Sequence, residues 1–192
     1  MTTESLTMPI DKSEMKIRSL EWRDFQDLVE AFDSYRDEVA ANPSVGIFLM
    51  YPKPTPASRL AWFSSLYLGV LEGDSVAYVV ECDGKAVGMC QADRRAPQQE
   101  QRHIGDLGIN IRKEYRDSGV GTALISKVIE KCMGKFEIIQ LVVWSNNERA
   151  KHIYSKLGFK TTGHTSKAVK RGSTYFDEDQ MSLNMAELRQ LT

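Results

Sequence analysis

Apolar residues alternate with polar ones along the middle of the chain, and this alternation predicts a β-sheet. Residues 75–82 and 85–93 are two such runs, and Asp83-Gly84 between them is a dipeptide typical of a two-residue hairpin turn. Residues 104–111 continue the sheet, so three antiparallel strands follow one another. Residues 138–144 form a further strand that is entered through a helix, and we therefore expect it to lie parallel to the strand at 104–111.

Helical spacing of apolar residues, interrupted by proline and glycine, predicts the remaining elements. They are a strand at 15–20, helices at 21–40 and 56–72 separated by a proline-rich loop, a polar loop at 94–101, a helix at 119–133, a helix capped within 145–147 and ending at Gly158, and a hairpin of strands at 160–170 and 174–185 turned at Arg171-Gly172. The inward residues of the first two helices are expected to be Phe25, Leu28, Val29 and Phe32, and Leu60, Phe63, Tyr67 and Val70.

Length and composition favour one globular domain. The chain has 192 residues, of which 42% are hydrophobic and 27% charged, and this is enough to bury a core. We expect the domain at 15–186, between a flexible tail at 1–14 and a short tail at 187–192. The 25 Lys and Arg against 26 Asp and Glu give a net charge of −1, so no global positive field favours nucleic acid.

Cysteine usage and hydropathy bear on location. Cys82, Cys90 and Cys132 are odd in number and lack the spacing of metal ligands, so buried free thiols in a reducing compartment are expected. No run approaches the roughly 18 apolar residues of a membrane span. We therefore expect a soluble, cytoplasmic protein that binds neither membrane nor nucleic acid and holds no metal.

One stretch, residues 107–124, has the pattern of an anion-binding loop. An apolar strand runs into a charged turn with two glycines and then into an amphipathic helix, which gathers free backbone N–H groups at a helix N-terminus. Gly119 and Gly121 would let a phosphate approach the backbone, and Arg116 would add a positive charge. The dinucleotide fingerprint fails because Leu124 would have to be glycine, and the P-loop pattern fails as well. A simple helix start with a tight turn is the alternative.

A second stretch, residues 141–159, follows at the spacing of one helix and one strand. It begins as a buried strand, has polar capping residues, and continues as a helix that ends at Gly158. Asn147, Ala150 and Tyr154 lie on this helix, and the last two are four residues apart and share a face.

With these two motifs in order, the chain resembles the GNAT superfamily of acetyl-CoA-dependent N-acetyltransferases from about Met15 to Met185. Arg116 to Gly121 resembles the family's Arg/Gln-x-x-Gly-x-Gly/Ala pyrophosphate loop, and Asn147 to Phe159 resembles its second cofactor motif with a Gly-Phe ending. The resemblance implies an α/β GNAT fold: a mixed, mostly antiparallel sheet of about seven strands, flanked by about four helices, with a V-shaped splay between the fourth and fifth strands. The acetyl-CoA-binding residues that it implies are Ile109, Asn110, Ile111, Arg116, Asp117, Ser118, Gly119, Val120, Gly121, Thr122, Asn147, Ala150 and Tyr154.

Acetyl transfer from a thioester to an amine needs a proton for the departing thiolate and an acceptor for the proton of the amine. The resemblance assigns the first task to Tyr154, whose alternative role is packing on the sheet. Asp106 is the expected base or ammonium anchor, with Glu81, His103 and water as competitors. The resemblance also implies direct attack in a ternary complex and a possible homodimer.

The acceptor is less determined by the sequence. Aromatic residues between Val45 and Tyr67 fall in the region that lines the acceptor side in the superfamily, although they could equally be core. A protein or peptide amine, an amino acid and a polyamine all remain open. The alternative from another class is an acetyl-CoA-binding sensor or regulatory module of the same fold without turnover.

Overall fold

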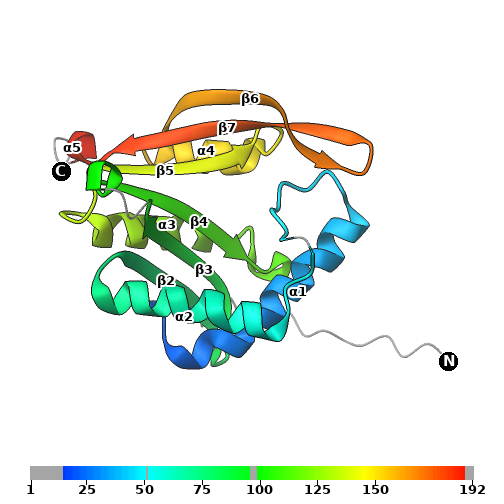
Figure 1. The fold of residues 1–192 in the computed structure, drawn as a ribbon, viewed down its shortest axis with the longest axis horizontal. Helices are drawn as coiled ribbons and strands as arrows, with labels where there is room; N and C mark the ends of the chain where they lie inside the picture. The colour runs from blue at the N-terminus through cyan, green and yellow to red at the C-terminus, as the bar shows by residue number, and fades with distance from the viewer. Residues whose placement is uncertain (1–14, 51, 96–98, 189–192) are drawn as a thin grey trace.

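The computed structural model describes residues 15–50, 52–95 and 99–188. Its centre is a seven-stranded sheet in the order β1-β2-β3-β4-β5-β7-β6 (Figure 1). All neighbours are antiparallel except β4 and β5, which are parallel, as the sequence predicts. The strands are β1 Lys16–Ser19, β2 Ser75–Cys82, β3 Lys85–Arg94, β4 Ile104–Ile111, β5 Ile138–Trp144, β6 Lys160–Arg171 and β7 Thr174–Asn184.

Helices cover both faces of the sheet and give it two hydrophobic cores. The core under α1 and α2 contains Leu28, Phe63 and Met89, whereas the core under α3 and α4 contains Leu124 and Ile139. In Figure 1, α2 crosses in front of β2 and β3 while α3 lies behind them. The helices are α1 Phe25–Ala41, α2 Pro56–Glu72, α3 Val120–Cys132, α4 Glu148–Lys156 and α5 Met185–Leu188, with 3-10 turns at Trp22–Asp24, Gln99–Gln101 and Lys113–Tyr115.

The two central strands separate soon after they meet. β4 and β5 pair only at residues 104–106 and 138–140, yet β4 continues to Ile111 and β5 to Trp144. Each strand keeps its other neighbour over this length, β3 for β4 and β7 for β5. The sheet therefore opens into a V between the fourth and fifth strands, which confirms the expected splay and leaves one edge of β4 unpaired.

Several local predictions are confirmed and a few are wrong. Asp83 and Gly84 both have positive φ, as a tight hairpin turn of this type requires. Leu60 is 45% exposed rather than inward, because the buried stripe of α2 runs through Phe63 and Leu66. The short helix α5 was not predicted, and it takes in Glu187 from the expected C-terminal tail. The expected tail at 1–14 lies outside the described residues.

Two further findings concern the described part of the chain. Cys82, Cys90 and Cys132 are buried free thiols, as expected. No helix among the described residues is long and apolar enough to cross a membrane.

Candidate functional site

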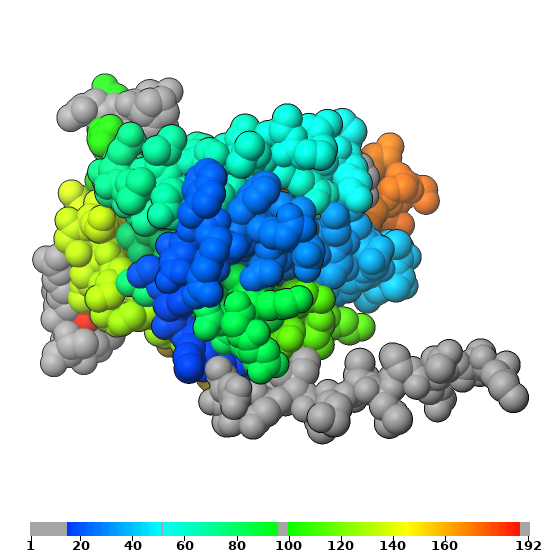
Figure 2. Space-filling model, turned by 90° about the horizontal axis from the view of Figure 1, so that it is seen from below, coloured from blue at the N-terminus to red at the C-terminus, as the bar shows by residue number. Residues whose placement is uncertain are grey.

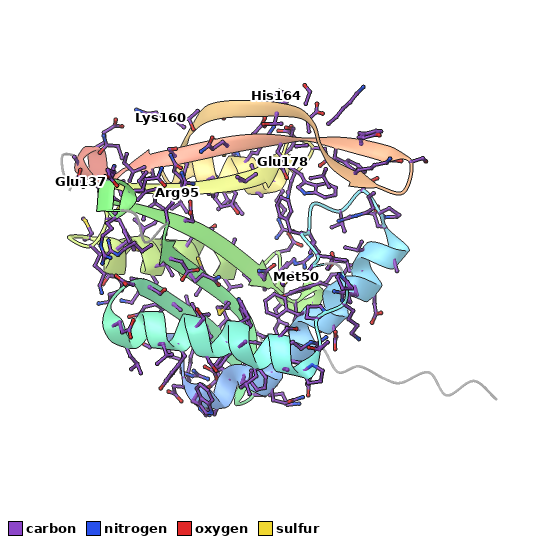
Figure 3. The ribbon with its side chains drawn as sticks, viewed as in Figure 1. Met50, Arg95, Glu137, Lys160, His164 and Glu178 are labelled. Carbon is purple, nitrogen blue, oxygen red and sulfur yellow. The ribbon has the colours of Figure 1, made fainter. Side chains whose placement is uncertain are left out.

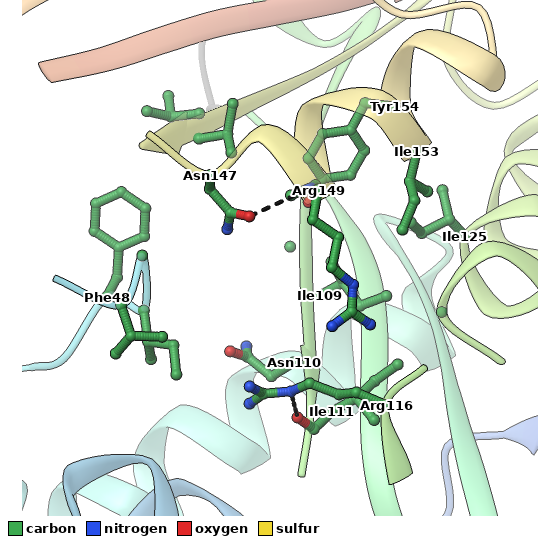
Figure 4. A pocket seen from close by; sticks show the side chains of 18 of the residues that line it. Phe48, Ile109, Asn110, Ile111, Arg116, Ile125, Asn147, Arg149, Ile153 and Tyr154 are labelled. Carbon is green, nitrogen blue, oxygen red and sulfur yellow. Dashed lines mark hydrogen bonds between the residues drawn. The ribbon is translucent and has the colours of Figure 1, made fainter. Parts of the chain in front are cut away.

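A cleft of about 630 Å³ opens where β4 and β5 separate (Figure 4). Its walls come from four parts of the chain that are distant in sequence. Three predicted residues of β4, Ile109, Asn110 and Ile111, lie on one side, and α4, from Arg149 to Tyr154, lies on the other. Because β4 has no partner strand here, its backbone N–H and C=O groups are available to an extended ligand arm.

The glycine loop ends at the N-terminus of α3 with the geometry of an anion site. Gly119 is the N-cap residue at φ 79° and ψ −10°, in the left-handed region that favours glycine. No side chain caps this helix, so the first backbone N–H groups keep their capacity to bind an anion. A Cβ added at Gly119 would meet no protein atom within 4 Å, so the space beside it is open to a ligand.

The other residues predicted in this loop have different placements. Gly121 lines the cleft, whereas Val120 is 7% exposed and its side chain packs in the core. Asp117 has φ 61°, and Ser118 donates its hydroxyl to the carbonyl of Tyr115 at 3.0 Å. Asp117 and Ser118 therefore shape the turn. Val120 and Thr122 lie in the first turn of α3, so each can contribute its backbone N–H to the site.

Arg116 lines the cleft, but it is not the simple cation that the sequence suggested. Its Nη1 and Nη2 donate to the two carboxylate oxygens of Glu38 on α1 at 2.7 and 2.9 Å. Its Nε donates to the carbonyl of Ile111 at 2.7 Å, a bond drawn in Figure 4. A carboxylate in bidentate contact neutralises most of the guanidinium charge. Arg116 therefore ties the loop to α1 and to the end of β4.

A second arginine at the cleft was not predicted. Arg149 lies between Asn147 and Ala150 on α4, lines the cleft and is 53% exposed at its side chain. It forms an ion pair with Asp117 at 2.9 Å across the mouth of the glycine loop. An exposed pair of this kind is weak and can exchange partners, so Arg149 can turn toward a phosphate.

Helix α4 brings together the three residues that the second motif predicted. Asn147 is the N-cap of α4, and its side-chain oxygen accepts from the N–H of Ala150 at 3.2 Å (Figure 4). Asn147, Ala150 and Tyr154 all line the cleft. The ring of Tyr154 packs edge-on against Phe159, with centroids 5.8 Å apart. The tyrosine thus has both a packing role and access to the cleft.

Burial strongly perturbs the phenol. Tyr154 is 8% exposed, and desolvation raises its pKa well above the ordinary value, with a smaller contribution from Cys90. The phenol therefore keeps its proton at neutral and mildly alkaline pH. A group in this state can donate a proton but cannot act as a base.

The segment after α1 forms a further wall of the cleft, whereas the sequence analysis places Val45 to Tyr67 on the acceptor side alone. Residues 44–48 line the cleft, and Arg171 from the β6–β7 hairpin holds them in place. Its Nη1 donates to the carbonyls of Pro43 and Val45 at 2.7 and 3.0 Å, and its Nη2 donates to Ile47 at 2.8 Å. The tip of that hairpin, orange in Figure 2, emerges beside this segment.

Neither predicted base lies at the cleft. The carboxylate of Asp106 accepts hydrogen bonds from Nε of Arg95 at 3.0 Å and from its Nη2 at 2.5 Å. Glu81 forms ion pairs with Arg18 and Arg23. Figure 3 shows Arg95 near the start of β4 and Met50 near its end. Asp106, like the neighbouring His103, therefore sits at the closed end of the V, and the structure does not bring it together with Tyr154.

A second, smaller pocket adjoins the cleft on the α1 and α2 side of the sheet. Its volume is about 220 Å³, and it is lined by residues of α1, of the segment after α1, of α2, and of β3 and β4. Phe48 and Asn110 line both cavities. Among the described residues, Asn110 makes no side-chain hydrogen bond, so its amide at this junction can serve a ligand.

The family model described as acetyltransferase (GNAT) family matches residues 16–159. The chain belongs to this family. Acetyl-CoA is the family's co-substrate, and the unpaired edge of β4 and the uncapped start of α3 fit the extended arm and the pyrophosphate of such a ligand.

Known proteins in this family resemble the chain over most of its length. It is 28% identical over 174 residues to the L-amino acid N-acetyltransferase AaaT of Escherichia coli strain K12, covering 88% of this chain and 98% of that protein. It is also 28% identical over 155 residues to the spermidine N(1)-acetyltransferase of the same organism, covering 78% of this chain and 74% of that protein. The solved structure of yncA from Salmonella typhimurium with acetyl-CoA shares the fold at a TM-score of 0.75 and 18% identity, over 90% of this chain and 94% of that one.

Proposed function

We propose that this GNAT acetyltransferase transfers the acetyl group of acetyl-CoA directly to a primary amine while both substrates are bound. The observation that carries the proposal is the junction at Phe48 and Asn110, two residues that line both the cofactor cleft and a second, adjoining pocket. Two reactants held in adjoining cavities react as if at very high local concentration. A module that only senses acetyl-CoA has no need of the second pocket.

The cysteines support direct transfer over an acetyl-enzyme intermediate. A nucleophilic cysteine must be an accessible thiolate. Cys82, Cys90 and Cys132 are buried, and burial raises the pKa of Cys90 well above its usual value and that of Cys132 to about 12. None of these three buried thiols is accessible to the thioester, and we infer that the amine itself is the attacking group.

Tyr154 is the proposed acid. Acetyl-CoA supplies an activated thioester, and when the amine nitrogen bonds to the acyl carbon the carbon–sulfur bond breaks and leaves a thiolate. The Tyr154 phenol donates its proton to that sulfur. Its raised pKa does not exclude this step, because the same desolvation also raises the pKa of a thiol in the cleft.

The proton of the amine is proposed to leave through water. Asp106 lies at the closed end of the V in an ion pair with Arg95, and Glu81 is held by two arginines at the β1 side of the sheet. Asn110 at the junction can accept a hydrogen bond from the incoming amine and so orient it, but an amide does not take a proton.

A mass-spectrometric screen tests this function. The protein is incubated with acetyl-CoA and, separately, with amino acids, polyamines and short peptides, and products are examined for the mass of one added acetyl group. Acetylation of one amine class is expected. Tight binding of acetyl-CoA without turnover of any amine would instead favour the sensor. Cytoplasmic location and a homodimer belong to the same proposal and are tested by fractionation and by sedimentation.

A further inference from the structure

Helix α2 carries apolar residues on its solvent side as well as on its buried side. Phe63 and Leu66 pack against the sheet, yet Leu60, Leu68 and Leu71 are 45%, 52% and 67% exposed. A surface helix of a globular protein normally turns polar side chains to water, and a helix that is apolar all round is normally covered on every side. The outward face of α2 therefore has the character of a surface that is covered by another molecule.

The exposed leucines belong to one continuous surface, which we call the α2 patch. Successive residues of a helix are about 100° apart, so six positions of α2 fall within one arc of its circumference. Trp22 is 51% exposed and extends this arc, because its ring packs edge-on against Tyr67 of α2 with centroids 5.3 Å apart. Figure 2 shows this face, with residues 22–24 in blue beside α2 in teal to cyan. The helix contributes Ala57, Leu60, Ala61, Ser64, Leu68 and Leu71, all exposed except the partly buried Ser64.

The patch has no charge of its own. Residues 60–71 contain no Asp, Glu, Lys or Arg, although these residues make up 27% of the chain. In a two-fold pair the same surface lies on both sides of the interface, and like charges that face each other weaken such a pair. An uncharged apolar patch avoids this repulsion, so its chemistry suits a second copy of the same chain.

The order of residues along the patch fits two α2 helices packed antiparallel. Ser64 lies halfway between Ala57 and Leu71 in the sequence. A two-fold axis that passes beside Ser64 places Leu60 opposite Leu68 of the second copy, and Ala57 opposite Leu71 of the second copy. Each large side chain then meets an apolar one, and the small side chains at Ala57 and Ser64 let the two helices approach closely.

The two ends of α2 add opposite charges to this arrangement. Lys53 precedes the helix and lies 3.4 Å from Asp33, but its side chain remains 61% exposed. Glu72 is the last residue of the helix and is exposed. Antiparallel packing brings Lys53 of one copy toward Glu72 of the other, and it sets the positive end of each helix dipole beside the negative end of its neighbour. Parallel packing would bring like ends together.

The patch is large enough to form the centre of a stable interface. With about 200 Å² for a fully exposed large apolar side chain, Trp22, Leu60, Leu68 and Leu71 together expose roughly 400 Å². A standard interface covers about 800 Å² on each partner, of which about 56% or roughly 450 Å² is non-polar. The four side chains therefore supply most of the apolar area that a stable dimer needs.

From these observations we propose that two copies of this chain pair through the α2 patch, with their α2 helices antiparallel about a two-fold axis beside Ser64. This inference rests on the homodimer of the proposed function and gives it a surface and a geometry. The transfer of the acetyl group does not depend on it.

Sedimentation equilibrium of the full chain tests the surface. The wild type is expected to form a dimer with a Kd of about 1 µM or tighter, as interfaces of standard size do. Leu68→Glu changes a side chain that is exposed in the single copy, so the melting temperature of the fold should hold, but it places a charge in the interface and should raise Kd at least tenfold. Met133→Glu is the matched control, since Met133 is a 40% exposed apolar residue after α3, outside the patch, and should leave Kd unchanged.

Two results would overturn the proposal. A dimer that Leu68→Glu does not weaken would place the interface elsewhere on the protein. A wild type that remains a monomer at every concentration would leave the patch to a different partner. In both cases acetylation of an amine in the mass-spectrometric screen would leave the proposed transfer standing.

A new cysteine tests the antiparallel geometry. Cys82, Cys90 and Cys132 are buried, so they should not react under mild oxidation. Ser64→Cys places a thiol from each copy beside the axis, and the two should join into a disulfide-linked dimer. Ala57→Cys lies about 20 Å from its counterpart in an antiparallel pair, too far for a disulfide, and is the control. A disulfide that forms as readily in Ala57→Cys as in Ser64→Cys would overturn the antiparallel arrangement.

Discussion

The cofactor cleft and the acceptor pocket adjoin each other but are built in different ways. The groups of the cleft that fit acetyl-CoA are largely backbone groups: an unpaired strand edge on β4, the glycine turn at Gly119 and the uncapped start of α3. The acceptor pocket is made of side chains from α1, α2 and the segment between them. Backbone groups are the same for every residue, so the cleft can keep its ligand while sequences change. Side chains differ, so we expect the pocket to set the acceptor.

The contrast extends to how firmly each part is held. The cleft side of the loop is fixed by Arg116, which joins Glu38 to Ile111. The dividing segment, residues 44–48 between the two cavities, is held by Arg171 of the β6–β7 hairpin, which donates hydrogen bonds to its backbone carbonyls. We therefore expect changes in the cleft to act on acetyl-CoA or on the chemical step, and changes at the dividing segment to act on both substrates.

The largest effect is expected at Tyr154. Tyr154→Phe keeps the ring against Phe159 and removes only the hydroxyl, so kcat should fall about 100-fold or more while affinity for acetyl-CoA is nearly intact. Because burial raises the pKa of this phenol, kcat of the parent should not decline before about pH 10, the ordinary value for tyrosine. Steady-state kinetics and calorimetric titration measure both. Wild-type kcat in the variant would assign Tyr154 to packing alone.

The second-largest effect is expected at Gly119, where backbone groups form the anion site of the cofactor cleft. Gly119→Val forces a branched side chain into a left-handed φ of 79° and into the open space of the anion site, so acetyl-CoA should bind at least tenfold more weakly, about 1.4 kcal/mol. Gly134→Val is a matched control, since Gly134 also has φ 79° and no neighbouring atom within 4 Å, but it lies outside the cleft. Both variants should lose similar stability. Equal loss of cofactor affinity in both would show that strain alone is responsible.

The contrast between backbone groups in the cleft and side chains in the pocket also explains how much of each region the sequence predicts. Local sequence patterns predict the cleft, because Gly119 and Gly121 mark the turn and Asn147 and Tyr154 keep helical spacing at α4. The corrected role of Arg116 could not be predicted, because its partner Glu38 is 78 residues away. The inward stripe of α2 was misplaced at Leu60 because helical periodicity alone does not say which face meets the sheet.

The acceptor side depends on contacts that no local pattern contains. Arg171 binds carbonyl groups 124 to 128 residues earlier in the chain. The carbonyl groups belong to the backbone, so the residue types at 43–47 give no sign of the contact. Arg149 is different, because its place between Asn147 and Ala150 in the second motif could have identified it.

A moderate effect is expected at the dividing segment. Arg171→Ala removes three hydrogen bonds to the carbonyls of Pro43, Val45 and Ile47 and the stacking on Trp144, so the segment should loosen. KM for both substrates should rise roughly fivefold, about 1 kcal/mol, with a smaller change in kcat. Arg171→Lys should recover only part of the loss, since an ammonium cannot span the carbonyls as a guanidinium does. Unaltered KM values in Arg171→Ala would mean that the segment holds its place without this contact.

The smallest effect is expected at Asp106. Asp106→Asn breaks a partly exposed ion pair with Arg95 at the closed end of the V, away from both cavities. Across pH 6 to 9 (roughly the range in which an amine with a pKa near 8 titrates), kcat/KM for the amine should stay within about twofold of the parent. A shifted pH profile would restore Asp106 as the base.

Direct transfer at the junction of the two cavities is tested most directly by initial-velocity kinetics with both substrates varied. If the amine attacks while acetyl-CoA occupies the cleft beside Phe48 and Asn110, double-reciprocal plots must intersect. Parallel lines, with burst release of coenzyme A before the amine is added, would show an acetyl-enzyme intermediate instead. That result would contradict the inference, drawn from the three buried cysteines, that the amine attacks acetyl-CoA directly.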